Sequence, residues 1–356
     1  MNEQKTLRYF LGANTASGFF SLYDSFVSLD EGDFLWIIKG GPGCGKSSFM
    51  KMLGAAAERA GLLVEYAMCS GDPASLDGVY IPALKTAYMD GTAPHIADAR
   101  ITAVDSAYLD LGVFYDISAI SEYRPELNLL RKSTGALHKK AYTLLHAEGV
   151  LRRDWQNSFI SDAEKKSATK RINGIIAREF GRKSAEAGTI KRRFLSALSC
   201  QGRISLIETA QTLCKRFYLF DDNLGLSALM LDKIAQGAIR AGHDIIICPD
   251  PLLPENTEAV LVPSLSLGFV GTTLSEIPKA RRIRLDNAFG IEKLRSLKPE
   301  LRRCERLCEA LQSEALSALA ESKKQHDSIE AIYNPNVDFD GVYALVRSHM
   351  AALGLK

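Results

Sequence analysis

The stretch "FLWIIKGGPGCGKSSFM", from Phe34 to Met50, sets the architecture expected for the first half of this chain. "FLWIIK" is an apolar run typical of a buried strand, and the following "SSFMKMLGAAAERA" is typical of a helix. Between them Gly40, Gly45, Lys46 and Ser47 satisfy the pattern G-x-x-x-x-G-K-[ST]. A strand, a glycine-rich loop and a helix in this order predict a P-loop, which binds phosphate groups.

The chemistry of the predicted loop follows from its residue types. Glycines permit positive φ and let backbone N–H groups converge on phosphate oxygens at the N-terminus of the helix. Lys46 would reach the β and γ phosphates, and the hydroxyl of Ser47 would hold Mg²⁺. Cys44 is either an inert loop residue or a redox sensor. The residues expected to bind the nucleotide are Gly40, Gly41, Pro42, Gly43, Cys44, Gly45, Lys46, Ser47 and Ser48.

Composition narrows the class of protein. The chain has 356 residues, a net charge of +2 and 46% apolar residues, which suits two globular domains. No apolar run approaches the ~18 residues that span a bilayer, and the N-terminus lacks the features of a signal peptide. Seven scattered cysteines argue against a disulfide framework. We therefore expect a cytoplasmic protein without a membrane span.

The chain also repeats itself at an offset near 180 residues. "RYFLGANTASGFFSL" from Arg8 pairs with "RRFLSALSCQGRISL" from Arg192, and "ERAGLLVEYAMCSGDP" from Glu58 pairs with "IRAGHDIIICPDP" from Ile239. Because the blocks keep their order, a tandem duplication of one domain is the economical explanation.

Strands alternating with helices predict an α/β fold with two tandem P-loop-like parallel-sheet domains, each carrying a helical hairpin. Residues 1–190 would form the nucleotide-binding domain, with a helical arm over about 121–190. Residues 191–356 would form a degenerate P-loop-like domain with C-terminal helices.

The second half serves as an internal control for the first. Its loop reads "DDNLGLSALM", from Asp221 to Met230. Counting back from the shared "RAG" places Ser227 opposite Lys46 and Ala228 opposite Ser47. Acidic residues now stand where glycines would donate to a phosphate, so we expect this loop to repel that ligand.

The same comparison ranks the acidic residues of the first half. Asp90 faces Gly271, or Val270 in a shifted register, so the acid is lost together with the lysine. An acid just past a short strand is what a Mg²⁺-holding Walker B residue requires. Asp77, opposite Glu258, is a weaker candidate that could orient water.

Two further residues have competing interpretations. Asp72 matches Asp250 in the second half, which favours a turn or capping role. His95 in "GTAPH" has no clear counterpart in the second half. It is a candidate for the γ-phosphate region, and the alternative is an ordinary loop histidine.

Charge is concentrated in the middle of the chain. From Ser121 to Phe194 there are seventeen Lys or Arg residues against eight Asp or Glu residues. This basic arm could dock nucleic acid or an acidic protein partner. Interspersed acids and few aromatic residues favour the simpler interpretation, a solvated helical face. The residues that could contact phosphates are Arg152, Arg153, Lys165, Lys166, Lys170, Arg171, Arg182, Lys183, Lys191, Arg192 and Arg193.

With "KGGPGCGKSS", "SGDPASLDGVYIP" and "DGTAPH" in this order, the sequence resembles a family of bacterial duplicated P-loop ATPase-like proteins of uncharacterised function. Its members look like "KGGPGTGKS", "CSSDPDSLDGV" and "DGTAPH". The resemblance covers essentially the whole chain. It implies an ATP-binding P-loop fold with a duplication and supplies no substrate.

These observations predict an ATP-binding protein that hydrolyses ATP with Mg²⁺ at one site in the first half and uses the energy to drive or gate a conformational change. An arginine from the other half, or from another subunit of a homo-oligomer, would complete the site. The alternatives are an ATP-regulated binding module that acts through its basic arm, and a kinase for a small molecule or nucleotide. ATP is favoured over GTP because the sequence has no N/TKxD signature for guanine.

Overall fold

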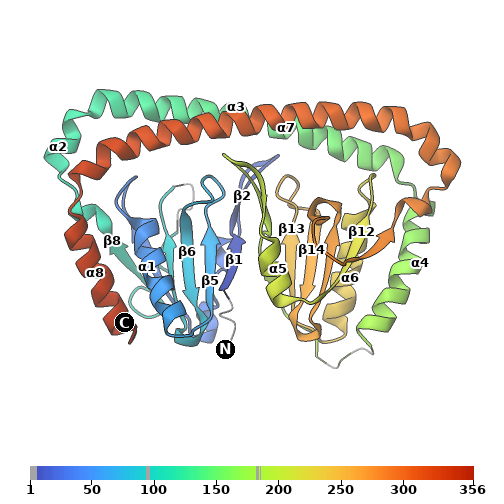
Figure 1. Ribbon diagram of the computed structural model, residues 1–356, viewed down its shortest axis with the longest axis horizontal. Helices are drawn as coiled ribbons and strands as arrows, with labels where there is room; N and C mark the ends of the chain where they lie inside the picture. The colour runs from blue at the N-terminus through green and yellow to red at the C-terminus, as the bar shows by residue number, and fades with distance from the viewer. Residues whose placement is uncertain (1–5, 94–96, 182–183, 185) are drawn as a thin grey trace.

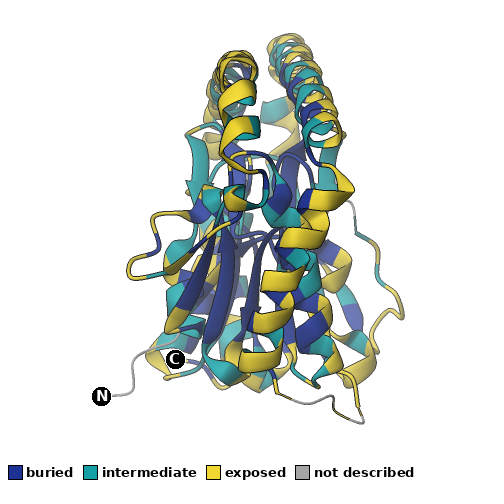
Figure 2. Ribbon diagram, turned by 90° about the vertical axis from the view of Figure 1, so that its right-hand side faces the viewer, coloured by how far each residue is buried: buried dark blue, intermediate teal, exposed yellow. Residues whose placement is uncertain are grey.

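A computed structural model describes residues 6–93, 97–181, 184 and 186–356 of the chain. Two six-stranded sheets lie side by side, and two long helices run across both of them (Figure 1). Figure 2 shows strands that are mostly buried and long helices whose outer faces are exposed. Among the described helices none has the length and apolar character needed to cross a membrane.

The first sheet has the strand order β1-β5-β6-β7-β4-β8. The apolar strand β4 lies between β7 and β8 and is parallel to both. The strands of this sheet are β1 (Thr6–Phe10), β4 (Phe34–Lys39), β5 (Val64–Met68), β6 (Leu76–Ile81), β7 (Thr86–Asp90) and β8 (Ser106–Asp110).

The second sheet repeats this topology, with the order β16-β12-β15-β14-β13-β9. Each strand has a counterpart in the first sheet, with the same neighbours and the same relative direction. The tandem arrangement expected from the sequence is therefore observed. The strands are β9 (Ile190–Arg192), β12 (Arg216–Asp221), β13 (Ile245–Pro249), β14 (Thr257–Val262), β15 (Leu267–Gly271) and β16 (Arg281–Arg284).

The prediction of purely parallel sheets is wrong in one strand of each half. β6 and β14 run antiparallel to both of their neighbours. The reason is the length of the connections, since only residues 82–85 join β6 to β7. A parallel neighbour requires a crossover of a dozen or more residues, whereas a short turn reverses the chain.

Two small hairpins join the halves. They are β2 (Gly12–Thr15) with β3 (Gly18–Ser21), and β10 (Ser196–Ser199) with β11 (Gly202–Ser205). Immediately before them, Phe10 and Phe194 exchange two backbone hydrogen bonds of 2.9 and 3.0 Å. Both phenylalanines are fully buried, so the halves share a core at this point.

Shorter helices complete each half. α1 (Lys46–Arg59) follows β4, and α6 (Leu226–Arg240) follows β12. α2 (Ile117–Glu122) precedes the first long helix, and α5 (Ile207–Leu213) precedes β12. The expected order of strand, loop and helix is thus present in both halves.

The predicted helical hairpin within each half is wrong. α3 (Arg124–Phe159) and α7 (Ile291–Tyr333) instead pair with each other, antiparallel, across both sheets (Figure 1). A helix of 36 residues is about 54 Å long, enough to cross from one sheet to the other. The seam between α3 and α7 includes Ala141, Ala318 and Leu319, which are buried together.

As a result, each half sends its last helix to the other half. α4 (Asp162–Glu179) packs on α6, with Ile172 and Ile175 buried in the core of the second sheet. α8 (Phe339–Ala352) packs on α1, with Val346 fully buried in the core of the first sheet. The apolar faces of these two helices are therefore covered only after the exchange.

Candidate functional site

The loop between β4 and α1, residues 40–45, has the backbone that a phosphate cradle needs. Gly40, Gly43 and Gly45 have φ values of 146°, 69° and 89°, a region that side chains with a Cβ rarely adopt. Gly45 is the N-cap of α1, so the N-terminal amides of α1 open toward the loop. The loop therefore combines three glycines of positive φ with the positive end of a helix dipole.

Lys46 lies over this loop. Its Nζ atom donates to the carbonyl oxygens of Gly40 and Gly41 at 2.8 and 2.9 Å. The same atom is 3.7 Å from Oδ2 of Asp90, and both side chains are mostly buried. Lys46 and Asp90 therefore lie side by side. The comparison of the two halves singles them out because both are missing from the second half.

Asp90 is held in a fixed orientation at the end of β7. Its Oδ1 atom accepts hydrogen bonds from the backbone N–H and the hydroxyl of Thr92, at 2.8 and 2.6 Å. This leaves Oδ2 facing Lys46. Burial raises the pKa of Asp90, and the nearby Lys46 opposes that shift.

Ser47 occupies the first turn of α1, and its Oγ accepts a hydrogen bond from the backbone N–H of Leu76 at 3.0 Å. Together with Asp90, this hydroxyl fits the one or two protein ligands that Mg²⁺ takes when phosphates supply the rest. The described residues contain no group of three or more His, Cys, Asp or Glu side chains that could hold a metal ion by themselves. Ser48 is exposed.

Asp77 lies behind this pair and is buried. Tyr23 donates its hydroxyl to Asp77 at 2.7 Å, and burial together with Asp77 raises the pKa of Tyr23. The charge of Asp77 also contributes to the raised pKa of Asp90, so the two carboxylates are neighbours. Gly78 pairs with Met89, so Asp77 and Asp90 lie at facing positions of the neighbouring strands β6 and β7. Tyr23 is a neighbour of Asp77 that the sequence did not single out.

The structure gives different outcomes for the other candidate residues of the first half. Asp72 accepts a hydrogen bond from the backbone N–H of Ala74 at 3.1 Å, which fits the turn role. Cys44 is buried, and burial raises the pKa of its thiol, which disfavours the thiolate that a redox sensor needs. His95 lies outside the described residues.

The second half covers the loop, which the sequence did not predict. The oxygen of the Asn334 side chain is 2.5 Å from where a Cβ on Gly43 would lie. Phe339 and Val342 of α8 stand 3.5 Å from the corresponding point on Gly45. The corner between α7 and α8, formed by η8 (Asn334–Asn336), is therefore seated on the loop.

An acid of α7 also touches the cradle. Glu330 lies close to Gly43, whose backbone N–H is one of the groups that favour the ionised form of its carboxyl. The pKa of this carboxyl is lowered, first by its hydrogen bond with His326 and also by that contact with the loop. A carboxylate in this position would compete with a phosphate for the loop amides.

A shallow, open hollow of about 430 Å³ lies beside the covered loop, between residues 113–116 and 335–338. Tyr115 lines it and donates its hydroxyl to the carbonyl of Pro42 at 2.9 Å. Phe114 adds a second aromatic ring to the lining. The hollow lies on the β8 side of β4, away from β7 and Asp90, and it is large enough for a nucleoside.

The loop of the second half is closed by its own acid. Asp222 is buried and accepts the backbone N–H groups of Leu224 and Ser227 at 2.9 and 2.6 Å. The carboxylate thus takes the place that an anion would occupy in the first half. Burial raises the pKa of Asp222, and these two N–H donors lower it.

The structure also corrects the register of this loop. Gly225 is the N-cap of α6 with φ 86° and ψ 15°, nearly identical to Gly45 with φ 89° and ψ 13°. The loop is shorter by two residues, so buried Leu226 replaces Lys46 and Ser227 replaces Ser47. Counting back from "RAG" failed because α6 has fifteen residues where α1 has fourteen.

The strand registers show which residues of the second half correspond to Asp90 and Asp77. Asp90 pairs with Ile38 in the first sheet, and Gly271 pairs with Phe220 at the same place in the second. Asp77 and Glu258 are each the second residue of equivalent strands. The acid beside the loop is therefore absent from the second half, while the buried acid persists.

The basic arm is partly committed to internal contacts. Arg193 is fully buried and donates to the carbonyls of Ser25 and Phe26, so it cannot contact an external phosphate. Arg152 and Arg153 form ion pairs with acids of the same chain. Arg182 and Lys183 lie outside the described residues. Of the eleven residues proposed to contact phosphates, those that the structure shows as exposed are Lys165, Lys166, Lys170, Arg171, Lys191 and Arg192.

No family model, curated protein or solved structure matches this chain. The geometry of its two loops is therefore the basis for any functional assignment.

Proposed function

We propose that the first half binds ATP with Mg²⁺ and hydrolyses it, and that the nucleotide state moves the corner between α7 and α8. The observation that carries this proposal is the contact of one loop with both halves. Its glycines, Lys46 and Asp90 supply phosphate chemistry, while Glu330 and Asn334 of the second half lie on the same loop.

The first step of the proposal is phosphate binding. Lys46 already lies among loop carbonyls and beside Asp90, so only a local rotation is needed to bring its charge to the β and γ phosphates. Ser47 and Asp90 would then hold Mg²⁺, directly or through water. The hollow lined by Tyr115 would take the base, which places the phosphates along the loop.

The second step couples the phosphates to the long helices. A γ-phosphate and the Glu330 carboxylate repel each other, so ATP binding favours a position of α7 in which Glu330 has left Gly43. Hydrolysis and phosphate release would allow the contact to form again. Because α7 crosses both sheets, this local event would be transmitted to the second half.

The test is Mg²⁺-dependent phosphate release by the full chain, compared between wild type and Lys46→Ala. We expect the variant to lose activity by roughly 10²–10³-fold, since Lys46 neutralises charge that develops on the γ-phosphate. Ser47→Ala and Ser227→Ala form a matched pair at equivalent positions of the two loops. Only the first should lower activity, and equal effects would contradict a single site in the first half.

A second candidate function is favoured by the exposed cations of α4, among them Lys166, Lys170 and Arg171. In this alternative ATP binds without turnover and sets the state of a docking surface for nucleic acid or an acidic protein. Intact ATP binding with no phosphate release would favour it. An affinity for DNA or RNA that falls steeply with salt would then identify the partner.

A further inference from the structure

The second half contains a cavity of about 200 Å³ beside its own loop, next to Gly271 and Glu258, the counterparts of Asp90 and Asp77. It is lined by the closed loop of residues 222–225, by the ends of β14 and β15, and by side chains of α3 and α7. Asp222 already occupies the loop amides, so a nucleotide cannot bind here as it would in the first half. The cavity is also smaller than the about 300–1,000 Å³ of sites for drug-sized ligands.

Two buried donors of the cavity lining lack an acceptor in the part of the chain that the structure describes. They are the Nε atom of Arg203 and the Nε1 atom of Trp155. A buried N–H group without an acceptor is costly, so such groups are rare unless a ligand or water completes them. Both groups are donors, which indicates that the missing partner carries acceptor oxygens.

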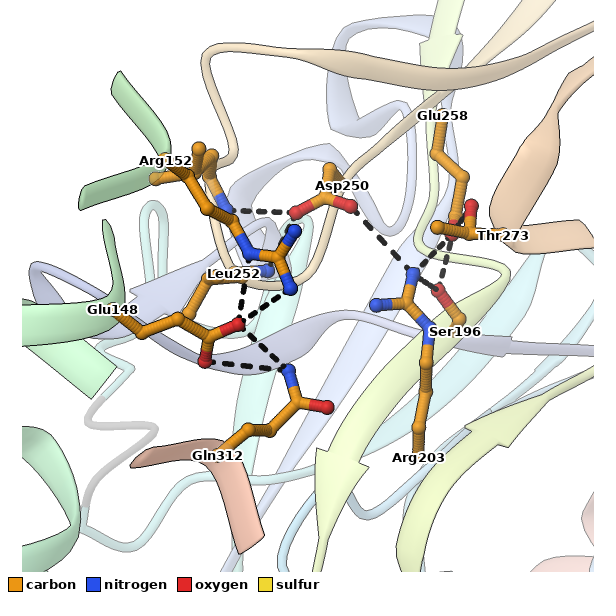
Figure 3. A network of polar contacts seen from close by, with 10 residues as sticks. Glu148, Arg152, Ser196, Arg203, Asp250, Leu252, Glu258, Thr273 and Gln312 are labelled. Atoms are coloured by element: carbon orange, nitrogen blue, oxygen red, sulfur yellow. Dashed lines mark hydrogen bonds and ion pairs between the residues drawn. The ribbon is translucent and has the colours of Figure 1, made fainter. Parts of the chain in front are cut away.

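Two guanidinium groups face each other across this space (Figure 3). Arg203 is held from one side by Glu258 and by Asp250, whose Oδ2 is 3.6 Å away. Arg152 is held from the other side by Glu148 at 2.8 Å. These ion pairs fix the two planar groups, and Figure 3 shows the Asp250 carboxylate next to both of them.

Three acids around the cavity accept hydrogen bonds from protein donors. Glu258 accepts from Ser196, Thr273 and Arg203, and Asp250 accepts the backbone N–H groups of Leu252 and Leu253. Glu148 accepts from Arg152 and from the Gln312 amide. Each of these three carboxylates thus has a partner within the protein, whereas Nε of Arg203 and Nε1 of Trp155 have none among the described residues.

We propose that this cavity binds a small oxyanion, the phosphate or carboxylate group of a metabolite, between Arg152 and Arg203. The ligand would accept hydrogen bonds from both guanidinium groups and from Trp155. The site is independent of the nucleotide site, because the two loops belong to different halves and Asp222 closes the second one.

The chain provides a specific reporter for this site. It has two tryptophans, Trp36 in the first half and Trp155 in the cavity lining. In a Trp36→Phe variant of the full chain, only Trp155 fluoresces strongly. Titration with inorganic phosphate and, separately, with malonate should give a saturable change in emission with at least one of the two. The anion that binds more tightly identifies the headgroup as phosphate or carboxylate.

Matched variants locate the binding. Arg152→Lys should weaken the apparent affinity by at least about tenfold, because a lysine cannot form the bidentate contact. Arg153→Lys, at the next position of α3 and outside the cavity lining, should not change it. Arg203→Lys should also weaken binding, and thermal unfolding of each variant shows whether it still folds.

Lys46→Ala separates this proposal from the nucleotide site, since phosphate could also bind the first loop. The emission change should persist in the Trp36→Phe, Lys46→Ala double variant. Loss of the response in that variant would assign the anion to the first loop and overturn the proposal. Absence of any response to either anion, or a response only to a cation such as spermidine, would overturn it as well.

Discussion

At the scale of single residues, Lys46 and Asp222 are the main difference between the two loops. Lys46 stands on a glycine loop and beside a carboxylate that Thr92 orients. In the second half a buried leucine replaces the lysine, and Asp222 fills the cradle from within. The second loop therefore lacks the cation and carries a carboxylate on its own amides, which disfavours an anion there.

Asp90→Asn tests the acid of the first site. We expect Mg²⁺-dependent phosphate release to fall by roughly 10²-fold, because the amide cannot place the metal. Burial raises the pKa of Asp90 in the folded protein. The stability that comes from protonating it is therefore present at low pH and is lost as the pH rises through the raised pKa.

Asparagine does not titrate, so the stability of the variant relative to wild type should increase as the pH rises from the ordinary pKa of an aspartate, about 4, through the raised pKa of Asp90. Urea denaturation of both proteins across this range measures the difference. A difference that stays constant with pH would show that Asp90 titrates normally in the folded state.

Asp222→Ala tests the closed loop. The change leaves the buried N–H groups of Leu224 and Ser227 without their acceptor, so we expect a loss of about 1–3 kcal/mol in unfolding free energy. Asp221→Ala is the matched control, since Asp221 is partly exposed and pairs with Arg282 at 3.5 Å. Its effect should stay below about 1 kcal/mol, and a larger loss from Asp221 than from Asp222 would refute this account.

At the scale of elements, the corner between α7 and α8 links the two halves. Here α7 ends on the first loop through Glu330 and Asn334, and α8 then packs on α1. The second half has the equivalent arrangement, because Gln156 near the end of α3 lies 2.5 Å from where a Cβ on Gly225 would be. Each loop is thus covered by the end of the long helix that starts in the other half.

Glu330→Gln tests this cover. Removing the carboxylate charge should tighten ATP binding by at least about fivefold, because a like charge no longer opposes the phosphates at Gly43. Isothermal titration calorimetry with ATP and Mg²⁺ measures the affinity. Glu321→Gln, an exposed acid paired with Lys324 on the same helix, is the control and should leave the affinity unchanged. Unchanged or weaker binding in Glu330→Gln would contradict the role of Glu330 as a competitor of the phosphate.

At the scale of the whole molecule, the exchange of α4 and α8 makes the halves interdependent. Ile172 and Ile175 of α4 are buried against the second sheet, and Val346 of α8 is buried against the first. Neither half therefore contains all of its own core. A nucleotide-driven shift of α7 would be felt by both sheets, because the same helices cover both.

Separate expression of residues 1–190 and 191–356 tests this interdependence. We expect each fragment alone to be unfolded or aggregated, since each would expose an apolar helix and an uncovered sheet. Co-expression should restore a soluble complex of the two fragments, detected by size-exclusion chromatography and circular dichroism. A fragment 1–190 that is folded and monomeric alone would contradict the prediction.

The sequence by itself determined the strand, loop and helix around Lys46, the duplication, and the choice of Asp90 as the partner of Lys46. These are local patterns or one-to-one matches along the chain, which residue type and spacing are enough to reveal. The antiparallel β6 was also within reach, because the connection to β7 is too short for a crossover.

Only the tertiary structure decided the exchange of α4 and α8, the cover of Glu330 and Asn334 over the first loop, and the cavity between Arg152 and Arg203. An amphipathic helix shows in its sequence that it will bury one face but does not show which sheet it will meet. In the same way, side chains that are distant along the chain, such as Arg152 and Arg203, become one site only when packing brings their elements together.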